Sequence, residues 1–203
     1  MKEIFKLGGI LLLVTALASG ALSMVNKITK PKIEEQKRLV VERALIAALP
    51  TADPKAIEKV IENDEILYYI GYTTQEKTDI AGYAFVAKKA GYSSVIETMV
   101  GVDTTGKIIG IKVMEEKETP GLGTKIEEIK YGESAPWFQL QFINRYAGEL
   151  AVDKDNGPIR SITGATISSR AVTNSIKEGL EQLEKRLGGF KKQANPTQTE
   201  QVS

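Results

Sequence analysis

Near its N-terminus the chain carries an uninterrupted run of uncharged residues from Leu7 to Val25, with the sequence LGGILLLVTALASGALSMV. A helix rises about 1.5 Å per residue, so this run would extend roughly 28 Å, close to the thickness of the hydrocarbon core of a bilayer. The sequence therefore predicts a membrane-spanning helix, and we expect residues 1–31 to form a membrane anchor. A cleaved signal peptide is the competing interpretation, because the small residues of Ala18–Ala21 resemble a cleavage site. The apolar part of a signal peptide is usually shorter, about 7–15 residues, which favours the anchor.

The charges that flank the apolar run bear on its orientation in a membrane. Lys2 and Lys6 precede the run, and a larger basic group follows it: Lys27, Lys30, Lys32, Lys37 and Arg38. A simple count of Lys and Arg would place the C-terminal side in the cytoplasm. Short N-terminal anchors often export the domain that follows them, so charge alone leaves the topology open.

Two residue types are missing from the chain, and their absence excludes several kinds of site. The 203 residues include no cysteine and no histidine. Thiolate ligation of iron–sulfur clusters, haem ligation by His or Cys, and Cys/His zinc sites are therefore excluded. His-based acid–base catalysis is excluded as well, and we expect neither a catalytic residue nor a metal site. Any redox chemistry must use a bound organic cofactor. The net charge of +1 gives no indication of a nucleic-acid partner.

The first part of the soluble region shows a helical pattern followed by strand patterns. Ile33–Leu49 has apolar residues near helical spacing, and Pro50 would end that helix. A short second helix is expected at Ala56–Ile61, so residues 32–64 are interpreted as a helical connector. Four strands rich in Ile, Val, Tyr and Phe follow: Ile66–Tyr72, Ile80–Ala87, Val95–Val102 and Lys107–Val113. A turn-forming sequence at Asp103–Lys107 joins the last two strands, which predicts an antiparallel sheet.

The C-terminal part of the soluble region is expected to supply the helices that flank this sheet. One helix is predicted at Ser134–Tyr146, a loop at Asp153–Pro158, and an amphipathic helix from Ser169 to Leu187. The predicted fold class is thus α+β, with one N-terminal transmembrane helix followed by a mostly antiparallel sheet flanked by helices. We expect residues 65–188 to form the folded domain and residues 189–203, in particular Ala194–Ser203, to form a disordered tail.

The segment Ser161–Ser169 (SITGATISS) is unusually rich in hydroxyl side chains and leads directly into the amphipathic helix. One interpretation is helix capping, in which a hydroxyl accepts hydrogen bonds from the free N–H groups of the first turn. Capping requires one hydroxyl, whereas this segment has several. The other interpretation is a phosphate site, because a helix start offers unpaired N–H groups and the positive end of the helix dipole, and Gly164 lets the backbone approach a ligand. The residues alone leave both interpretations open.

Four segments resemble the FMN-binding domain family. Thr163–Thr166 (TGAT) is similar to the flavinylation motif of that family, and Glu118–Gly123 (ETPGLG) is similar to its flavin-pocket loop. Val102–Ile108 resembles the hairpin that precedes this loop, and Trp137–Phe142 resembles the aromatic segment that follows it. The family includes the G subunit of the Rnf electron-transport complex and the C subunit of the sodium-pumping NADH:quinone reductase, and the former is the more similar. The resemblance covers residues 65–187.

The resemblance implies a specific cofactor and a specific attachment. Residues 65–188 would be an FMN-binding domain on the outer face of the cell membrane, with the FMN phosphate esterified to Thr166 by a separate flavin transferase. A separate transferase is expected because no evident base lies near Thr166 in the sequence. Arg160 and Arg170 are expected as additional cationic partners of the phosphate. The implied cofactor-binding residues are Thr163, Gly164, Ala165, Thr166, Glu118, Thr119, Gly121, Leu122 and Gly123.

Two positions depart from the family pattern, and one aromatic residue has two interpretations. Arg160 stands where many members have Asp, three residues before the first hydroxyl of the flavinylation motif. The sequence Gly91-Tyr92-Ser93-Ser94 stands where members often have Gly-Tyr-x-Gly, and we expect this change to alter a turn without affecting the flavin. Trp137 could stack near the flavin, but a lone Trp at a helix start is more often a core residue.

The function that the resemblance implies is electron transfer within a membrane complex. Rnf-type complexes pass electrons between ferredoxin and NAD while moving ions, and this chain would relay electrons between other membrane subunits of the complex. One alternative is a different flavinylated carrier, such as one serving extracellular electron transfer, which would share every motif. Another alternative, from a different class, is an envelope binding module without a cofactor.

Overall fold

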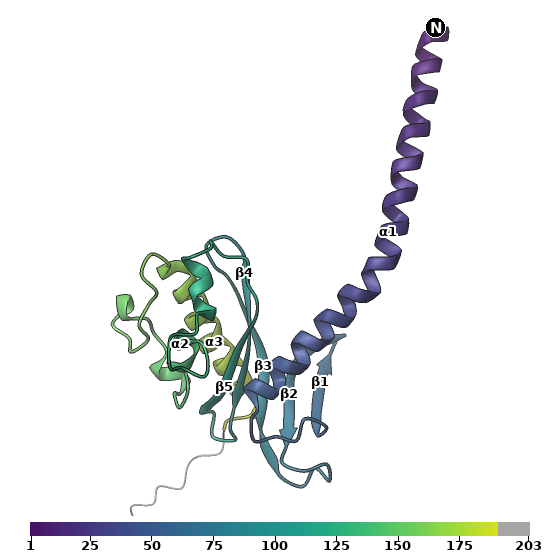
Figure 1. Cartoon of the computed structure of the whole chain (residues 1–203). Coiled ribbons are helices and arrows are strands. Elements are labelled where there is room, and N and C mark those ends of the chain that lie inside the picture. Colours follow the sequence, from purple (N-terminus) through teal and green to yellow (C-terminus); the bar gives the residue numbers. More distant parts are fainter. Residues whose placement is uncertain (191–203) are drawn as a thin grey trace, which may run out of the picture. The chain divides into compact units, whose positions relative to one another are not determined.

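The structure is a computed structural model that describes residues 1–190 (Figure 1). Of the predicted disordered tail at residues 189–203, residues 191–203 lie outside the described residues, whereas Phe190 is described and packs against the hydrophobic core. The chain divides into two compact units, Met1–Val40 and a second that begins at Val41. The second unit contains the sheet, the flanking helices and every residue of the site described below.

The N-terminal unit is helical. Helix α1 is assigned from Lys2 to Ala48 and contains Pro31. The helix predicted over Ile33–Leu49 is therefore the C-terminal part of α1 and does not begin as a new element. Within residues 1–190, α1 is the one helix that is long and apolar enough to cross a membrane, by length and composition, and none of its most apolar window is buried. A signal sequence would pass the same test, but the length of the apolar run again favours an anchor.

The second unit is built on a five-stranded sheet in which every neighbouring pair of strands is antiparallel. The spatial order equals the chain order, β1-β2-β3-β4-β5. The four predicted strands are confirmed, with slightly different ends, and a fifth precedes them. The strands are β1 (Ile57–Glu62), β2 (Glu65–Tyr72), β3 (Ile80–Ala90), β4 (Val95–Val102) and β5 (Ile108–Glu115).

The short helix predicted at Ala56–Ile61 is wrong, because these residues lead into the edge strand β1. Asn63 and Asp64, which connect β1 to β2, have φ angles of 50° and 63°. Two consecutive residues with positive φ are typical of the type I′ turn that closes a tight hairpin, and Asn and Asp tolerate this conformation better than most residues. The tight turn after β1 and the β-branched residues of Ile57–Ile61 both favour a strand over a helix.

Each face of the sheet is covered by a helix (Figure 1). Helix α3 (Thr166–Leu187) packs on the face formed by β3 and β4, where its buried side chains Val172, Ile176, Leu180 and Leu183 join the main core with Phe85, Val100 and Val102. The last turns of α1 contribute Ala44, Leu45 and Ala48 to a smaller core on the other face, with Tyr69, Ala84 and Met99. Fully burying one Val, Leu or Ile side chain stabilises a fold by about 1.5–3 kcal/mol, so α3 is fixed firmly to the sheet.

The segment between β5 and α3 has less regular structure than predicted. It contains the short elements η1 (Gly123–Glu127), α2 (Trp137–Leu140), η2 (Ala147–Glu149) and η3 (Asp153–Asp155). The helix predicted over Ser134–Tyr146 is reduced to the single turn α2, because Pro136 precedes it and Asn144 has a left-handed φ of 67°. Helix α3 begins at Thr166, three residues before the predicted start at Ser169.

Candidate functional site

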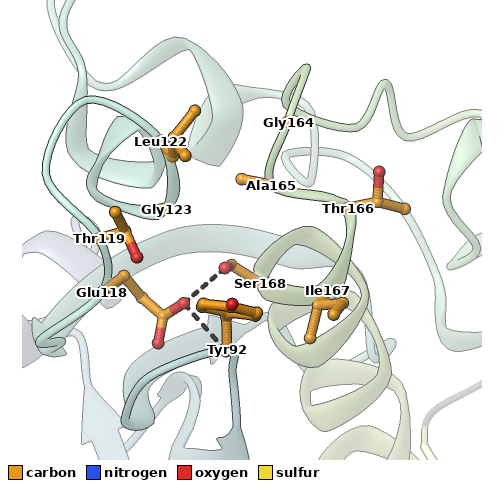
Figure 2. A pocket seen from close by; sticks show the side chains of 10 residues that line it. All are labelled: Tyr92, Glu118, Thr119, Leu122, Gly123, Gly164, Ala165, Thr166, Ile167 and Ser168. Carbon is orange, nitrogen blue, oxygen red and sulfur yellow. Dashed lines mark hydrogen bonds between the residues drawn. The ribbon is translucent and has the colours of Figure 1, made fainter.

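Three segments that are distant in the sequence surround one cavity of about 580 Å³ (Figure 2). The β3–β4 turn contributes one lining residue, the loop after β5 contributes four, and the segment that leads into α3 together with its first turn contributes five. The lining residues are Tyr92, Glu118, Thr119, Leu122, Gly123, Gly164, Ala165, Thr166, Ile167 and Ser168. The two main motifs of the sequence, ETPGLG and TGAT, therefore meet at this cavity.

The cavity lies against the N-terminal end of α3. Ala165 occupies the N-cap position with φ −135° and ψ 41°, and no side chain caps the helix. The first backbone hydrogen bond of the helix runs from the N–H of Ser169 to the carbonyl of Ala165. The N–H groups of residues 166–168 consequently lack intrahelical acceptors. They form, together with the helix dipole, an environment that favours an anion. No hydroxyl of Ser161–Ser169 caps α3, so the capping interpretation of this segment is wrong.

Gly164 sets the direction in which the chain enters this helix. Its φ is +79°, a conformation that residues with a side chain rarely adopt. A Cβ at this position would lie 3.0 Å from Cδ2 of Leu122. The TGAT and ETPGLG motifs are therefore in direct contact here, and the contact leaves little room for a side chain.

The hydroxyls of Ser161–Ser169 differ in what they bind. Three of them donate to protein acceptors: Ser161 to Asp153 Oδ1 (2.5 Å), Ser168 to Glu118 Oε2 (2.6 Å) and Ser169 to the Ala165 carbonyl (2.9 Å). The hydroxyls of Thr163 and Thr166 have no hydrogen-bond partner within residues 1–190. Thr166 lines the cavity and Thr163 does not. Thr166 is thus the hydroxyl of this segment that is both free of protein partners and placed at the cavity.

Glu118 is the most connected side chain of the site. It is 4% exposed and accepts hydrogen bonds on both oxygens. Oε2 accepts from the N–H of Tyr92 (3.0 Å) and from Ser168, while Oε1 accepts from the N–H groups of Ser93 (3.1 Å) and Ser94 (3.0 Å) and from the Ser94 hydroxyl (3.1 Å). One carboxylate therefore joins all three segments that surround the cavity.

These hydrogen bonds decide the charge of Glu118. Burial raises the pKa of the carboxyl, because it penalises the ionised form. The hydrogen bonds from Ser168 and from the backbone of Tyr92, Ser93 and Ser94 outweigh burial, so the pKa lies below its ordinary value. Glu118 is consequently ionised at neutral pH, and its negative charge is stabilised by hydrogen bonds from the protein.

The loop glycines have structural roles in addition to any role toward a ligand. A Cβ on Gly123 would lie 2.5 Å from Cβ of Glu118, so the packing of Glu118 requires glycine there. Gly121 has a positive φ of 74°, and its N–H donates to the Thr124 hydroxyl (3.1 Å). Gly121 does not line the cavity. Of the two loop glycines that the resemblance implies to bind the cofactor, only Gly123 therefore lines the cavity.

The two arginines named as cationic partners lie outside the lining of the cavity. Arg170 forms a two-point ion pair with Asp155, with Nε–Oδ2 and Nη2–Oδ1 distances of 2.8 and 2.7 Å. This hydrogen bonding lowers the pKa of Asp155 and raises the pKa of Arg170. Arg160 is exposed, and its backbone N–H and carbonyl are bound by the side chain of Gln141. Neither arginine lines the cavity, and the guanidinium of Arg170 is engaged with Asp155.

Most of the residues named from the sequence are brought together, and three lining residues were not named. Thr166, Gly164, Ala165, Glu118, Thr119, Leu122 and Gly123 surround the cavity, whereas Thr163 and Gly121 do not line it. Tyr92, Ile167 and Ser168 are the additional lining residues. Ile167 is 52% exposed, and no signal in the sequence indicated it, because the predicted helix began only at Ser169. Tyr92 was noticed only as part of an altered turn.

Trp137 is partly buried and packs against the core, which is closer to the core interpretation than to a place beside the flavin. Its ring packs against the main core and makes an edge-to-face contact with Phe138. Its Nε1 donates to Glu128 Oε2 (3.1 Å), and Lys130 Nζ lies 3.8 Å from the ring centroid. Trp137 does not line the cavity.

Two family models match the chain. The model described as FMN-binding domain matches residues 91–181, which include all ten lining residues, and the model described as RnfG N-terminal region matches residues 1–47. The first match therefore covers the cavity, and the second covers almost all of α1.

Relatives are similar over most of the chain. A Photorhabdus laumondii protein, named as the G subunit of an ion-translocating oxidoreductase complex, is 32% identical over 196 residues, which cover 87% of this chain and 89% of the relative. An Acetobacterium woodii protein, named as the G subunit of a Na⁺-translocating ferredoxin:NAD⁺ oxidoreductase complex, is 30% identical over 200 residues, which cover 89% and 91%. The crystal structure of Shewanella oneidensis NqrC matches with a TM-score of 0.43 and 16% identity, covering 68% of this chain and 74% of the other.

Proposed function

The chain belongs to the family of G subunits of Rnf-type ion-translocating oxidoreductase complexes, and from this premise we propose that it carries electrons on an FMN esterified through its phosphate to Thr166. The FMN supplies the redox chemistry when it is bound, because the chain itself has no redox-active side-chain cluster. The chain would receive electrons from one subunit of the complex and pass them to another.

The observation that carries this proposal is the position of Thr166. Its hydroxyl is free of protein partners, it begins a 22-residue helix whose first N–H groups are uncapped, and it lines the cavity. A phosphate on this oxygen would lie beside those N–H groups and the positive end of the helix dipole. No other hydroxyl of Ser161–Ser169 combines these properties within residues 1–190.

The residues of the cavity fit the rest of the cofactor. Leu122 and Ile167 supply exposed apolar surface at its edge, 43% and 52% exposed, and Ala165 supplies a buried apolar wall. A flat aromatic ring system would cover this apolar surface and remove it from water. The carboxylate of Glu118 already accepts hydrogen bonds from protein donors on both oxygens, so it does not depend on a ligand for its hydrogen bonds.

The attachment reaction would require a second protein. A threonine hydroxyl is a poor nucleophile unless a neighbouring base activates it. The Thr166 hydroxyl makes no hydrogen bond within residues 1–190, and Glu118 is engaged with other donors. This supports maturation by a flavin transferase that brings its own base, rather than self-modification.

The physiological role follows from the proposed relay. We infer that the complex couples electron transfer between ferredoxin and NAD to ion translocation, as the name of the Acetobacterium woodii relative states for that protein. We also place the flavin domain on the outer face of the cell membrane, with α1 as a single-pass anchor. The other membrane subunits of the complex would be its direct electron partners.

The mass of the intact, denatured protein purified from its native membrane tests the proposal. We expect a gain of one FMN less one water, located on the peptide that contains Thr166. Thr166→Val should abolish this gain without unfolding the protein, whereas Thr163→Val, the matched change three residues earlier, should retain most of it. Attached FMN in the Thr166→Val protein would refute the assignment, and an unmodified native protein would favour a binding module without cofactor.

Purification of the intact complex separates the two carrier hypotheses. An Rnf subunit should be isolated in one detergent particle with several multi-span membrane proteins. A flavinylated protein isolated without them would instead be a carrier of another kind, such as one that serves extracellular electron transfer.

A further inference from the structure

Tyr92 is the one aromatic residue among the ten that line the cavity, and it is 71% exposed (Figure 2). It lies on a different segment from Leu122 and Ile167, the two exposed aliphatic residues of the same cavity. Each of the three segments that form the site therefore presents one large apolar side chain to it. Large side chains left in water at a cavity mark a surface that a ligand covers.

The backbone of the Tyr92 turn is held unusually firmly for a surface turn. The N–H of Gly91 donates to the carbonyl of Ser94 at 2.7 Å, which closes the turn. The next three N–H groups, those of Tyr92, Ser93 and Ser94, all donate to the carboxylate of Glu118. Hydrogen bonds to a charged acceptor are roughly twice as strong as neutral ones. The position of the Tyr92 Cα is thus fixed by Glu118, although the side chain itself is exposed.

Glu118 fixes this turn relative to the helix that carries Thr166. The same oxygen, Oε2, accepts from the N–H of Tyr92 and from the hydroxyl of Ser168, which lies two residues after Thr166. Figure 2 shows both bonds meeting at the carboxylate, with the Tyr92 ring seen edge-on between Glu118 and Ile167. The distance from the Tyr92 turn to the start of α3 is therefore set by one side chain.

We propose that Tyr92 forms the aromatic wall of the cavity and packs against the isoalloxazine ring of the FMN, and that Glu118 is the positioning residue that holds Tyr92 there. This inference rests on the proposed function. It changes the role expected for Glu118, which acts through Tyr92 and Ser168 rather than by touching the cofactor. It also assigns a role to a turn that the sequence indicated to be remote from the flavin.

Flavin fluorescence tests the proposal, because a tyrosine or tryptophan side chain in contact with the isoalloxazine ring quenches its emission by donating an electron to the excited flavin. The experiment uses the full-length protein, purified in detergent from its native host with flavin attached, and intact mass establishes the flavin content of each variant. Tyr92→Leu should raise the fluorescence yield and lifetime per attached flavin several-fold. Tyr92→Trp should leave most of the quenching, because the indole is also an electron donor, whereas Tyr92→Phe should raise the yield as Tyr92→Leu does. Tyr131→Leu, a change at a fully exposed tyrosine outside the cavity, is the matched control and should change neither quantity.

A double-mutant cycle separates positioning by Glu118 from a general loss of stability. Glu118→Gln should raise the fluorescence yield in the wild-type background, because the loosened turn lets Tyr92 leave the ring. The same change should have no further effect in the Tyr92→Leu background, provided that thermal unfolding shows both proteins to be folded at the measurement temperature. An equal effect in both backgrounds would show that Glu118 acts on the flavin independently of Tyr92, and would overturn its positioning role.

The outcomes distinguish this inference from the function on which it rests. Attached flavin in every variant, with unchanged fluorescence in Tyr92→Leu, would overturn the aromatic wall and leave the electron-carrier proposal intact. An unmodified mass for the wild-type protein would overturn both. A several-fold increase confined to the Tyr92 and Glu118 variants would support both.

Discussion

Cδ2 of Leu122 lies 3.0 Å from the point where a Cβ on Gly164 would be placed, so the two sequence motifs touch at a residue that has no side chain. Gly164 also has a φ of +79°, which directs the chain into α3 two residues before its first residue, Thr166. The contact therefore sets both the entry of the helix and the edge of the cavity.

The first prediction concerns Gly164→Ala. The left-handed conformation costs an L-residue about 1–2 kcal/mol, and the added methyl group would in addition push against Leu122. We expect a loss of unfolding free energy and a marked drop in FMN attachment, measured by thermal unfolding and intact mass. Gly121→Ala is the matched control, because its φ is +74° but no atom lies within 4 Å of the added Cβ. It should show the conformational cost without the clash, and equal effects of the two variants would contradict the packing role of Leu122.

The second prediction concerns the hydrogen bond from Ser168 to Glu118. Loss of a hydrogen bond to a charged group typically costs about 1.5–3 kcal/mol, so Ser168→Ala should lower the unfolding free energy by that order. Ser175→Ala is a suitable control, because Ser175 is also buried on α3 but donates to the neutral carbonyl of Val172 in its own helix. Denaturant unfolding of the full-length protein measures both. A loss for Ser175→Ala as large as that for Ser168→Ala would argue against a special role of the carboxylate.

The third prediction follows from the ionisation of Glu118. Its pKa is below the ordinary value in the folded state, so the ionised carboxylate stabilises the fold at pH values above about 4.3. This contribution is lost as the pH falls through the lowered pKa. The difference in unfolding free energy between wild type and Glu118→Gln should therefore be largest near neutral pH and shrink below pH about 4. A difference for Glu118→Gln that does not change with pH would contradict the prediction, because it would mean that the carboxylate is protonated throughout.

The sequence predicted best those elements in which the spacing of apolar residues matches the face that the folded protein buries. The strands from Ile66 to Val113 and the amphipathic stretch of α3 follow the periods of a sheet and a helix, and the structure places them as predicted. The edge strand β1 was missed because Ala56–Ile61 is short and its strand character depends on the Asn63–Asp64 turn. A six-residue segment has too few residues for its period to decide between helix and strand.

The site was predictable in its motifs but not in its connections. Thr166 and the residues of the ETPGLG loop could be named because each motif is contiguous in the sequence. The bonds from Glu118 to Tyr92 and Ser168 span 26 and 50 residues along the chain, and no local pattern indicates them. The ion pair of Arg170 with Asp155 was equally inaccessible, which is why Arg170 was assigned to a phosphate.

The fourth prediction tests whether Arg170 serves its ion pair with Asp155 and not the FMN phosphate. Exposed ion pairs contribute little, at most about 1 kcal/mol, so Arg170→Ala should reduce stability slightly. Because its guanidinium is engaged with Asp155 and does not line the cavity, the variant should keep its attached FMN. Asp155→Ala breaks the same pair from the other side and should behave alike. Intact mass decides the question, since a strong loss of FMN in Arg170→Ala alone would show that this arginine serves the phosphate after all.

The last prediction concerns topology, where the charge count and the family resemblance disagree. The chain has no cysteine, so a single introduced thiol reports its own location without background. Glu76→Cys lies at an exposed turn of the folded domain, and Lys2→Cys precedes the apolar run. With the flavin domain on the outer face, a membrane-impermeant maleimide added to intact spheroplasts should label Glu76→Cys at once and Lys2→Cys only after permeabilisation. The reverse pattern would place the domain in the cytoplasm, as the Lys and Arg count indicates. A mature protein that lacks residue 2 altogether would instead identify residues 1–21 as a cleaved signal peptide, and would require another subunit to hold the flavin domain at the membrane.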